Sequence, residues 1–180
     1  VRQHGAMDYT TPPCDLDEVR RYRLGRIREA LIERDLAGII LYDQLNTRYA
    51  VDATNMQIWC THNETRYVFV PTQGPTVLFD FLGKTYMSEG ISTVDEVRAP
   101  KTFLYFTAGG DLLERARDWA TEMDDLIRSN SGGNKRIAID RIAPQGVLEM
   151  QRLGYDIHDG FEVMENAREI KSDGEIALMQ

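Results

Sequence analysis

The chain of 180 residues contains little cysteine and no long apolar run. Its two cysteines, Cys14 and Cys60, are too few and too far apart in sequence to predict a disulfide framework, which favours a reducing compartment such as the cytoplasm. A transmembrane helix needs about 18 or more consecutive apolar residues, and the sequence has no such run. The N-terminus lacks the apolar core of a signal peptide.

Basic residues are outnumbered by acidic ones. There are 21 Lys and Arg against 29 Asp and Glu, for a formal net charge of -8. Phosphate backbones and anionic membranes need clustered cations, so this balance argues against nucleic-acid and membrane partners. The richest basic stretch, from Arg20 to Arg28, is interleaved with apolar residues on an expected helix. That spacing favours a solvated helix face, with duplex or lipid binding as the minor alternative.

Recognisable catalytic and metal-binding motifs are also missing. The histidines His4, His62 and His158 lack the close spacing of metal ligands, and no phosphate-binding loop or GxSxG elbow is present. Cys60 and His62 would share a face if they lay on a strand, as a nucleophile and its base could. No third orienting group is evident, and a buried cysteine is the commoner situation. We expect neither catalytic nor metal-binding residues in this chain.

Hydrophobic patterning predicts an α/β fold with a mixed β-sheet flanked by helices. Two β-rich runs separated by a short Gly-containing loop indicate a hairpin, which makes the sheet mixed. Strand and helix alternate in the second half, as in βαβ units. Asp111 and Glu114 resemble a capping pair at the start of the most regular helix. Helices are expected at 17–35, 45–50, 81–89, 111–128, 145–153 and 161–167, and strands at 36–42, 66–71, 75–81, 95–99, 136–140 and 155–159.

One segment, from Asn55 to Tyr67, has the highest density of hydrogen-bonding side chains in the chain. It is expected to be irregular or strand-like, and it gathers Trp59, His62, Asn63 and Arg66. Trp and Arg are side chains that favour interfaces and ligand contacts. We expect a partner subunit or a ligand near this segment, although an ordinary strand and loop would have the same composition.

The last residues contain a helix start without a helix stop. Ser172 and Glu175 form a capping-box pattern, and Asp173 adds negative charge near the positive end of the helix dipole. Either a short frayed helix ends the chain, or the helix continues into a second domain of a longer protein. We therefore divide the chain into a polar leader (1–14), one domain (15–171) and the start of a linking helix (172–180).

Several strings resemble the N-terminal domain of the creatinase, prolidase and aminopeptidase P family. They are AGIILY, NTRYAVDAT, RYVFVPTQGPTVLFDF and, most specifically, AREIKSDGEIALMQ. The resemblance covers residues 15–180 and is poorest at 81–107. The string ATNMQIWCTHN is similar to the branch of the family that includes dimethylsulfoniopropionate lyases. It departs from creatinase, so creatine is not the expected substrate.

The resemblance implies a creatinase N-terminal domain-like fold with a ribonuclease H-like motif. Such a domain is non-catalytic, supports a homodimer and sends a loop toward the partner's active site. On this sequence the loop is Met56 to Arg66, so Trp59, His62, Asn63 and Arg66 are expected to face the substrate or the dimer partner.

Catalysis in this family belongs to a second domain, where two Asp, one His and two Glu bind a pair of divalent metals. Creatinase itself works without metal. The resemblance thus implies a cytoplasmic parent enzyme that acts on a small molecule or peptide: a metallopeptidase-like hydrolase (Xaa-Pro dipeptidase or aminopeptidase) or a lyase.

Two further hypotheses remain open. The same fold serves a histone chaperone as a peptide- or protein-binding module, and an acidic chain suits basic partners. A small independent enzyme that uses Cys60 and His62 is the third possibility.

Overall fold

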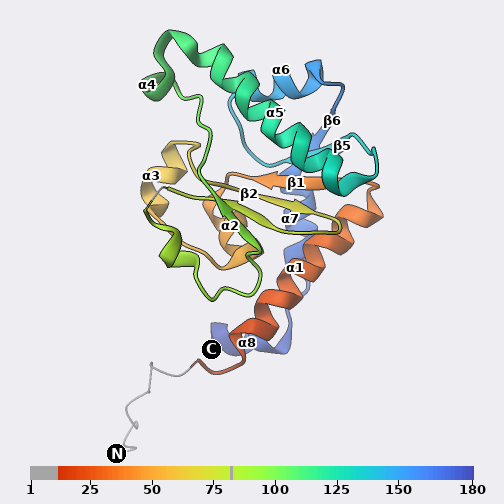
Figure 1. Ribbon diagram of the computed structural model, residues 1–180. Coiled ribbons are helices and arrows are strands. Elements are labelled where there is room, and N and C mark those ends of the chain that lie inside the picture. The colour runs from red at the N-terminus through yellow and green to blue at the C-terminus, as the bar shows by residue number, and fades with distance from the viewer. Residues whose placement is uncertain (1–11, 82) are drawn as a thin grey trace, which may run out of the picture.

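The computed structural model describes residues 12–81 and 83–180 (Figure 1). Most of the predicted leader lies outside these residues. The helices are α1 (Leu16–Glu33), α2 (Gln44–Val51), α3 (Gln57–His62), α4 (Tyr105–Ala108), α5 (Leu112–Ser131), α6 (Pro144–Arg152), α7 (Gly160–Glu169) and α8 (Asp173–Met179), with 3-10 turns η1 (Thr85–Ser88) and η2 (Gly109–Asp111). The strands are β1 (Gly38–Leu41), β2 (Tyr67–Pro71), β3 (Val77–Phe79), β4 (Glu96–Arg98), β5 (Arg136–Ile139) and β6 (Asp156–Asp159).

The strands form one mixed sheet in the order β4-β3-β2-β1-β5-β6. Strands β1, β5 and β6 pair in parallel, and so do β3 and β4. Strand β2 runs antiparallel to both of its neighbours, β1 and β3. The predicted α/β fold with a mixed sheet and a β2–β3 hairpin is therefore confirmed. Because β2 alone is reversed, it begins at the edge of the sheet where the other strands end.

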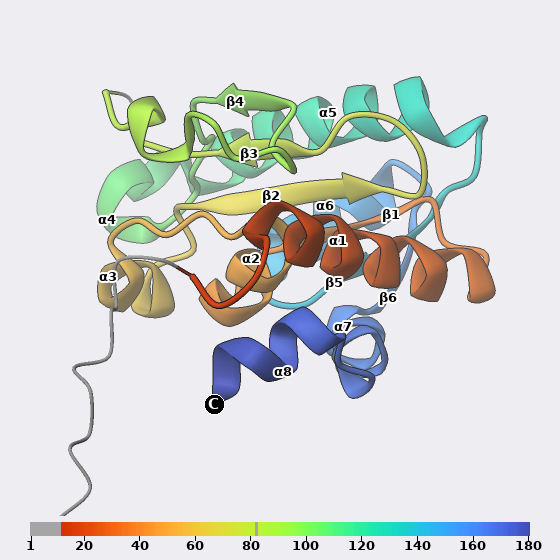
Figure 2. The same ribbon diagram turned by 90° about the horizontal axis from the view of Figure 1, so that it is seen from below.

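Helices cover both faces of the sheet (Figure 2). Helices α5 and α6 pack on one face, where Trp119 lies among Tyr67, Phe69 and Phe79 in an aromatic-rich core. Helices α1, α2 and α7 cover the other face, whose core is mainly aliphatic. The strand side chains alternate between these two cores, as period-two geometry requires.

Helix ends explain where several elements start. Asp15 caps α1 by accepting from the N–H groups of Asp17 and Glu18. The predicted capping box of α8 is present: Ser172 accepts from the N–H of Glu175, and the Glu175 carboxylate accepts from the N–H of Ser172. Glu175 also pairs with Arg23 of α1 at 2.8 Å, which fixes α8 against the domain.

Three local predictions were wrong. The segment expected to be irregular or strand-like contains α3. The helix expected at 81–89 is reduced to η1, because Gly83 adopts a left-handed φ of +79° that interrupts it. Asp111 makes no side-chain cap for α5, because it belongs to the preceding 3-10 turn η2 rather than having the extended backbone of an N-cap.

Candidate functional site

Trp59 and His62 lie on α3, and Asn63 follows it. The backbone N–H of Cys60 donates to the Met56 carbonyl, and that of Asn63 donates to the Trp59 carbonyl, both at 2.9 Å. Met56 precedes the helix with a φ of +43° and gives no side-chain cap. The helix therefore forms without the capping signal that would have predicted it.

Cys60 and His62 lie on a helix, so the prediction that they would share one face of a strand is wrong. Residues two apart on a helix are separated by about 200° around its axis, and here Cys60 is buried while His62 is exposed. The Cys60 thiol lies 3.7 Å from both the Asn55 carbonyl oxygen and the Thr65 hydroxyl. Burial raises the pKa of this thiol, which keeps it neutral and a poor nucleophile.

Beside α3 lies a pocket of about 330 Å³, which we call the aromatic pocket. The Trp59 ring meets the Phe106 ring edge to face, with centroids 5.6 Å apart. None of the lining side chains is ionisable, so the walls offer ring faces, methyl groups and hydroxyls. Such walls suit apolar groups and diffuse cations. The lining residues are Trp59, Thr65, Phe81, Ala99, Pro100, Thr102, Phe106 and Thr107.

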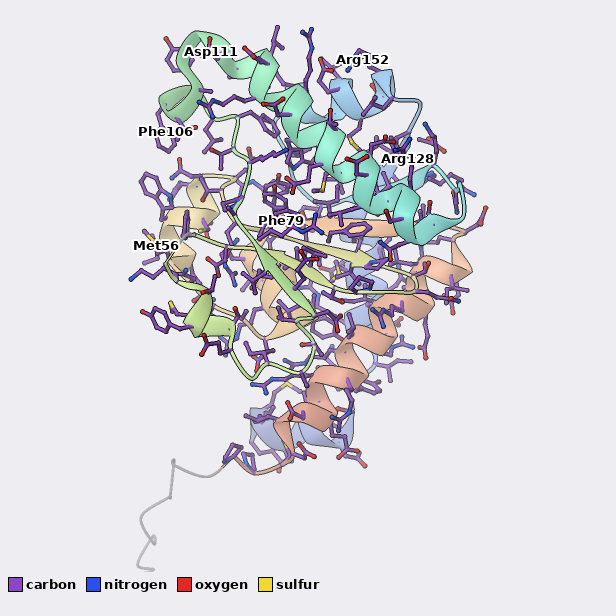
Figure 3. The ribbon with its side chains drawn as sticks, viewed as in Figure 1. Met56, Phe79, Phe106, Asp111, Arg128 and Arg152 are labelled. Carbon is purple, nitrogen blue, oxygen red and sulfur yellow. The ribbon has the colours of Figure 1, made fainter. Side chains whose placement is uncertain are left out.

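Exposed apolar side chains lie next to the lining residues Trp59 and Phe106 in the chain. Ile58 is 83% exposed and Tyr105 is 77% exposed, although both are large hydrophobic side chains. Figure 3 shows Met56 and Phe106 on the same side of the molecule. We call the set the α3–α4 face; it consists of Met56, Ile58, Trp59, Tyr105 and Phe106.

Arg66 lies in the interior, not at the surface. Its side chain is 1% exposed, and Nε donates to Asp80 Oδ2 at 2.9 Å. A weaker contact of 3.4 Å joins Arg66 Nη1 to Gln44 Oε1. Within this chain the guanidinium therefore faces Asp80 in the interior.

The other predicted contact residues are more accessible. His62 is exposed, and Asn63 is partly buried with its amide donating to the Trp59 carbonyl at 3.1 Å. Asn63 thus closes the end of α3, while Trp59 lines the aromatic pocket. Contact of these three side chains with a substrate or with a second copy stays a prediction.

A second, larger cleft of about 710 Å³ lies between α1, α2 and the α7–α8 region. Its charged side chains are largely paired with one another: Arg20 with Asp52 at 2.9 Å, and Arg23 with Glu175 at 2.8 Å. Arg23 also lies over the ring of Tyr49. Since these charges already have partners, we regard the aromatic pocket as the stronger candidate site.

A buried carboxylate joins the ends of β1 and β5. Asp140 accepts from the backbone N–H groups of Tyr42 and Asp43, at 2.7 and 3.1 Å, and from Asn46 Nδ2 at 2.9 Å. Burial raises the pKa of Asp140 to about 6, against the effect of these donors. The contacts hold the start of α2 to the sheet.

Across residues 12–81 and 83–180, no three His, Cys, Asp or Glu side chains are grouped so that they could hold a metal ion. Within the same residues, no helix is both long and apolar enough to cross a membrane.

Sequence reasoning missed Phe81, Phe106 and Asp80. The signal for Asp80 was in the hairpin: Tyr67 pairs with Phe79, so extending that register by one residue places Arg66 opposite Asp80. Phe106 could not be found in this way, because its contact with Trp59 depends on the path of the long connection after β4.

No family model matches the chain. Two curated relatives are both named dimethylsulfoniopropionate lyase DddP. The protein from Roseobacter denitrificans is 37% identical over 166 residues, and the one from Roseovarius nubinhibens is 35% identical over 166 residues. Each alignment covers 92% of this chain but 37% of the relative, so the chain spans little more than a third of their length.

Solved structures share the fold at low sequence identity. The prolidase from Thermococcus sibiricus has a TM-score of 0.58 at 17% identity, covering 96% of this chain and 40% of that one. The Xaa-Pro aminopeptidase from Streptococcus thermophilus has a TM-score of 0.57 at 15% identity, covering 83% and 98%. The N-terminal domain of the peptidase PepQ from Mycobacterium tuberculosis has a TM-score of 0.53 at 14% identity, covering 81% and 98%.

These comparisons confirm the resemblance to the creatinase, prolidase and aminopeptidase P family: the chain has the fold of the N-terminal domain of these proteins. Its curated relatives are named as lyases, not peptidases, which is the branch that the string ATNMQIWCTHN indicated.

Proposed function

We propose that this chain is the non-catalytic N-terminal domain of an enzyme related to the dimethylsulfoniopropionate lyases. In this proposal the domain supports a cytoplasmic homodimer and completes the active site of the partner subunit with its α3–α4 face. The identity to relatives of that name and the coverage of 37% of their length support the assignment. A divalent metal pair, if the parent enzyme uses one, would be held outside this chain.

The aromatic pocket is the observation that carries the proposal. Dimethylsulfoniopropionate combines a sulfonium cation with a carboxylate. A cation with methyl groups is attracted to the negative face of an aromatic ring and gains about 0.5–2 kcal/mol per ring contact. Trp59 and Phe106 offer such rings beside the hydroxyl-bearing walls of the pocket.

The lining of the pocket also suggests that this domain binds the substrate while another domain supplies the catalytic groups. General acid–base catalysis requires a titratable group within hydrogen-bond reach of the reacting atom. Among the described residues that line the pocket there is no Asp, Glu, His, Lys, Cys or Tyr. The proposed role is therefore to orient the cationic end of the substrate and to exclude water, while another domain supplies the proton transfer.

The decisive test begins with the source reading frame beyond Gln180. A continuation that contains two Asp, one His and two Glu as metal ligands would support the proposal, and the encoded protein can then be assayed with dimethylsulfoniopropionate. We expect Trp59→Ala to raise KM, while Phe161→Ala, which removes an exposed ring from α7, leaves it unchanged. If the frame lacks such ligands and the protein has no lyase activity, the proposal fails, and the binding module of the same fold becomes the better explanation.

The dimer is tested separately. Ile58 is almost fully exposed on α3, so a second copy that covers this face would exclude a charge there. We expect Ile58→Lys to shift the sedimentation of the protein toward the monomer, while Leu148→Lys on α6, also an exposed apolar position, has no effect. Equal sedimentation of both variants would contradict a dimer through the α3–α4 face.

A further inference from the structure

The walls of the aromatic pocket are connected through one buried carboxylate. Asp80 Oδ2 accepts from Arg66 Nε at 2.9 Å, and Asp80 Oδ1 accepts from Asn55 Nδ2 at 2.8 Å. The backbone N–H of Phe81 donates to the same Oδ1 at 2.7 Å. Asp80 and Arg66 are each 1% exposed, and Asn55 is 5% exposed. Out of contact with water, the carboxylate thus binds two other segments of the chain, at Asn55 and Arg66, and the backbone of its own segment at Phe81.

Each of these segments leads directly to a wall of the pocket. Phe81 follows Asp80, and Thr65 precedes Arg66; both residues line the pocket. The paired register of β2 and β3, extended past Tyr67 and Phe79, sets these two wall residues opposite each other. The hairpin end therefore forms one part of the pocket, and the ion pair fixes its geometry.

Asn55 forms the link to the opposite wall. It lies just before α3, and its carbonyl contacts the Cys60 thiol on the buried side of that helix. Helix α3 has no side-chain cap at its start, and Met56 there is in the left-handed region at φ +43°. A short helix with these features does not hold its own position. Its hydrogen bond through Asn55 to Asp80 therefore joins the start of the helix to the end of β3. The contact of Cys60 with Thr65 joins the helix to the start of β2.

We infer that the Asn55–Asp80–Arg66 network is a positioning element, which holds Trp59 at the distance from Phe81 and Thr65 that the pocket requires. In this role Arg66 does not touch a ligand. It fixes the neighbouring wall residue Thr65 through its ion pair with Asp80. This inference rests on the proposed function only for the identity of the ligand, since the positioning itself can be observed in the chain without any ligand.

The structure offers a matched pair of variants for the test. Asn55 and Asn46 are both buried amides, and each donates to a buried aspartate at the same edge of the sheet, at 2.8 and 2.9 Å. Asn55→Ala and Asn46→Ala each remove one amide–carboxylate bond, but Asn55 lies just before α3, whereas Asn46 lies near the start of α2. Should Asn55→Ala fail to fold, Asn55→Ser, which is too short to reach Asp80, is compared with Asn46→Ser.

Trp59 reports its own position. The other tryptophan, Trp119, is fully buried, so acrylamide quenches Trp59 selectively. Trp59 is 42% exposed in the structure. If α3 detaches from the sheet, the indole becomes fully exposed, so quenching by acrylamide should rise about twofold and the fluorescence emission should shift to the red. We expect this change for Asn55→Ala and not for Asn46→Ala, with both proteins folded by circular dichroism. Equal quenching in the two folded variants would overturn the inference.

A titration with dimethylsulfoniopropionate separates the two proposals. If Asn55→Ala exposes Trp59 and weakens binding, both stand. If it exposes Trp59 but the unsubstituted protein does not respond to the compound, the positioning element stands and the ligand assignment fails. If the unsubstituted protein binds the compound and Asn55→Ala leaves both Trp59 and binding unchanged, the positioning inference fails alone.

Discussion

Asn46 Nδ2 donates to the Asp140 carboxylate at 2.9 Å, beside the backbone N–H groups of Tyr42 and Asp43, so all three donors are N–H groups. The carboxylate directly follows β5 and the amide lies on α2, and both are buried. Two physical effects oppose each other here: the donors stabilise the charged carboxylate, and burial disfavours it. Burial is the larger effect, and it raises the pKa to about 6.

This pKa predicts how stability depends on pH. An acid whose pKa is higher in the folded state binds more protons there, so the unfolding free energy falls as pH rises. The fall extends from about pH 4, near the unfolded pKa, to about pH 6 and amounts to roughly 3 kcal/mol. Urea unfolding of the protein and of Asp140→Asn across this range should show a difference that shrinks with rising pH. A difference that grows would show that the N–H donors dominate.

Breaking the buried ion pair should cost much more than breaking an exposed one. Asp80→Asn leaves the guanidinium of Arg66 without a countercharge in the interior, so we expect a loss of about 3–5 kcal/mol in unfolding free energy. The matched control is Glu165→Gln, whose partner Arg168 is partly exposed, and its expected loss is below about 1 kcal/mol. Urea denaturation measures both.

A double replacement of the pair should restore much of that stability. In Arg66→Met with Asp80→Leu, no charge is left unpaired and the volume is roughly kept. The double variant should therefore unfold at a higher urea concentration than Asp80→Asn. A double variant less stable than the single one would show that the other hydrogen bonds of Asp80 matter more than its charge.

Removal of one ring should weaken cation binding without altering the fold. Phe106 is 59% exposed, so Phe106→Ala removes little buried area. Loss of its contact with a sulfonium group, about 0.5–2 kcal/mol, corresponds to about 2–30-fold weaker binding. Fluorescence titration with dimethylsulfoniopropionate measures this, and isocaproate, in which a C–H group replaces the sulfur cation, is the neutral control. Equal affinity for the two compounds would contradict cation recognition by the rings.

The capping box predicts a local effect at α8. Ser172→Ala removes the hydroxyl that accepts from the N–H of Glu175, which should cost about 1 kcal/mol. Hydrogen exchange of the α8 amides should become faster, while the strand amides stay unchanged. Ser129→Ala is the control, because that hydroxyl only donates to the Asp125 carbonyl within α5. Equal exchange of α8 in both variants would exclude a role for the box.

The sequence predicted those helices and strands whose turn, capping and apolar residues all indicate the same element. The hairpin of β2 and β3, helix α5 (expected at 111–128) and the capping box of α8 each follow from neighbouring residues. Helix α3 was not predictable in this way, since its start has a left-handed Met56 and no capping side chain.

The candidate site was predicted only in part. Trp59 was expected to face a substrate or a dimer partner, and this stays a prediction; the pocket that it lines has its opposite wall at Phe106, 47 positions further along the chain. Arginine is a residue type that often contacts ligands and partner proteins. The pairing of Arg66 with Asp80 shows that this arginine is buried inside the domain. Long-range contacts decide both cases, and residue type alone does not reveal them.

The reversal of β2 has a consequence for how such domains diverge. Because β2 begins where β1 ends, the chain leaves the sheet after Leu41 and re-enters it at Tyr67 at the same edge, and its part from Asp52 to Thr65 contributes no strand. Replacing this segment by a different sequence would leave every strand pairing intact. Two relatives can thus keep an identical scaffold and acquire different ligand preferences through one short replaceable stretch.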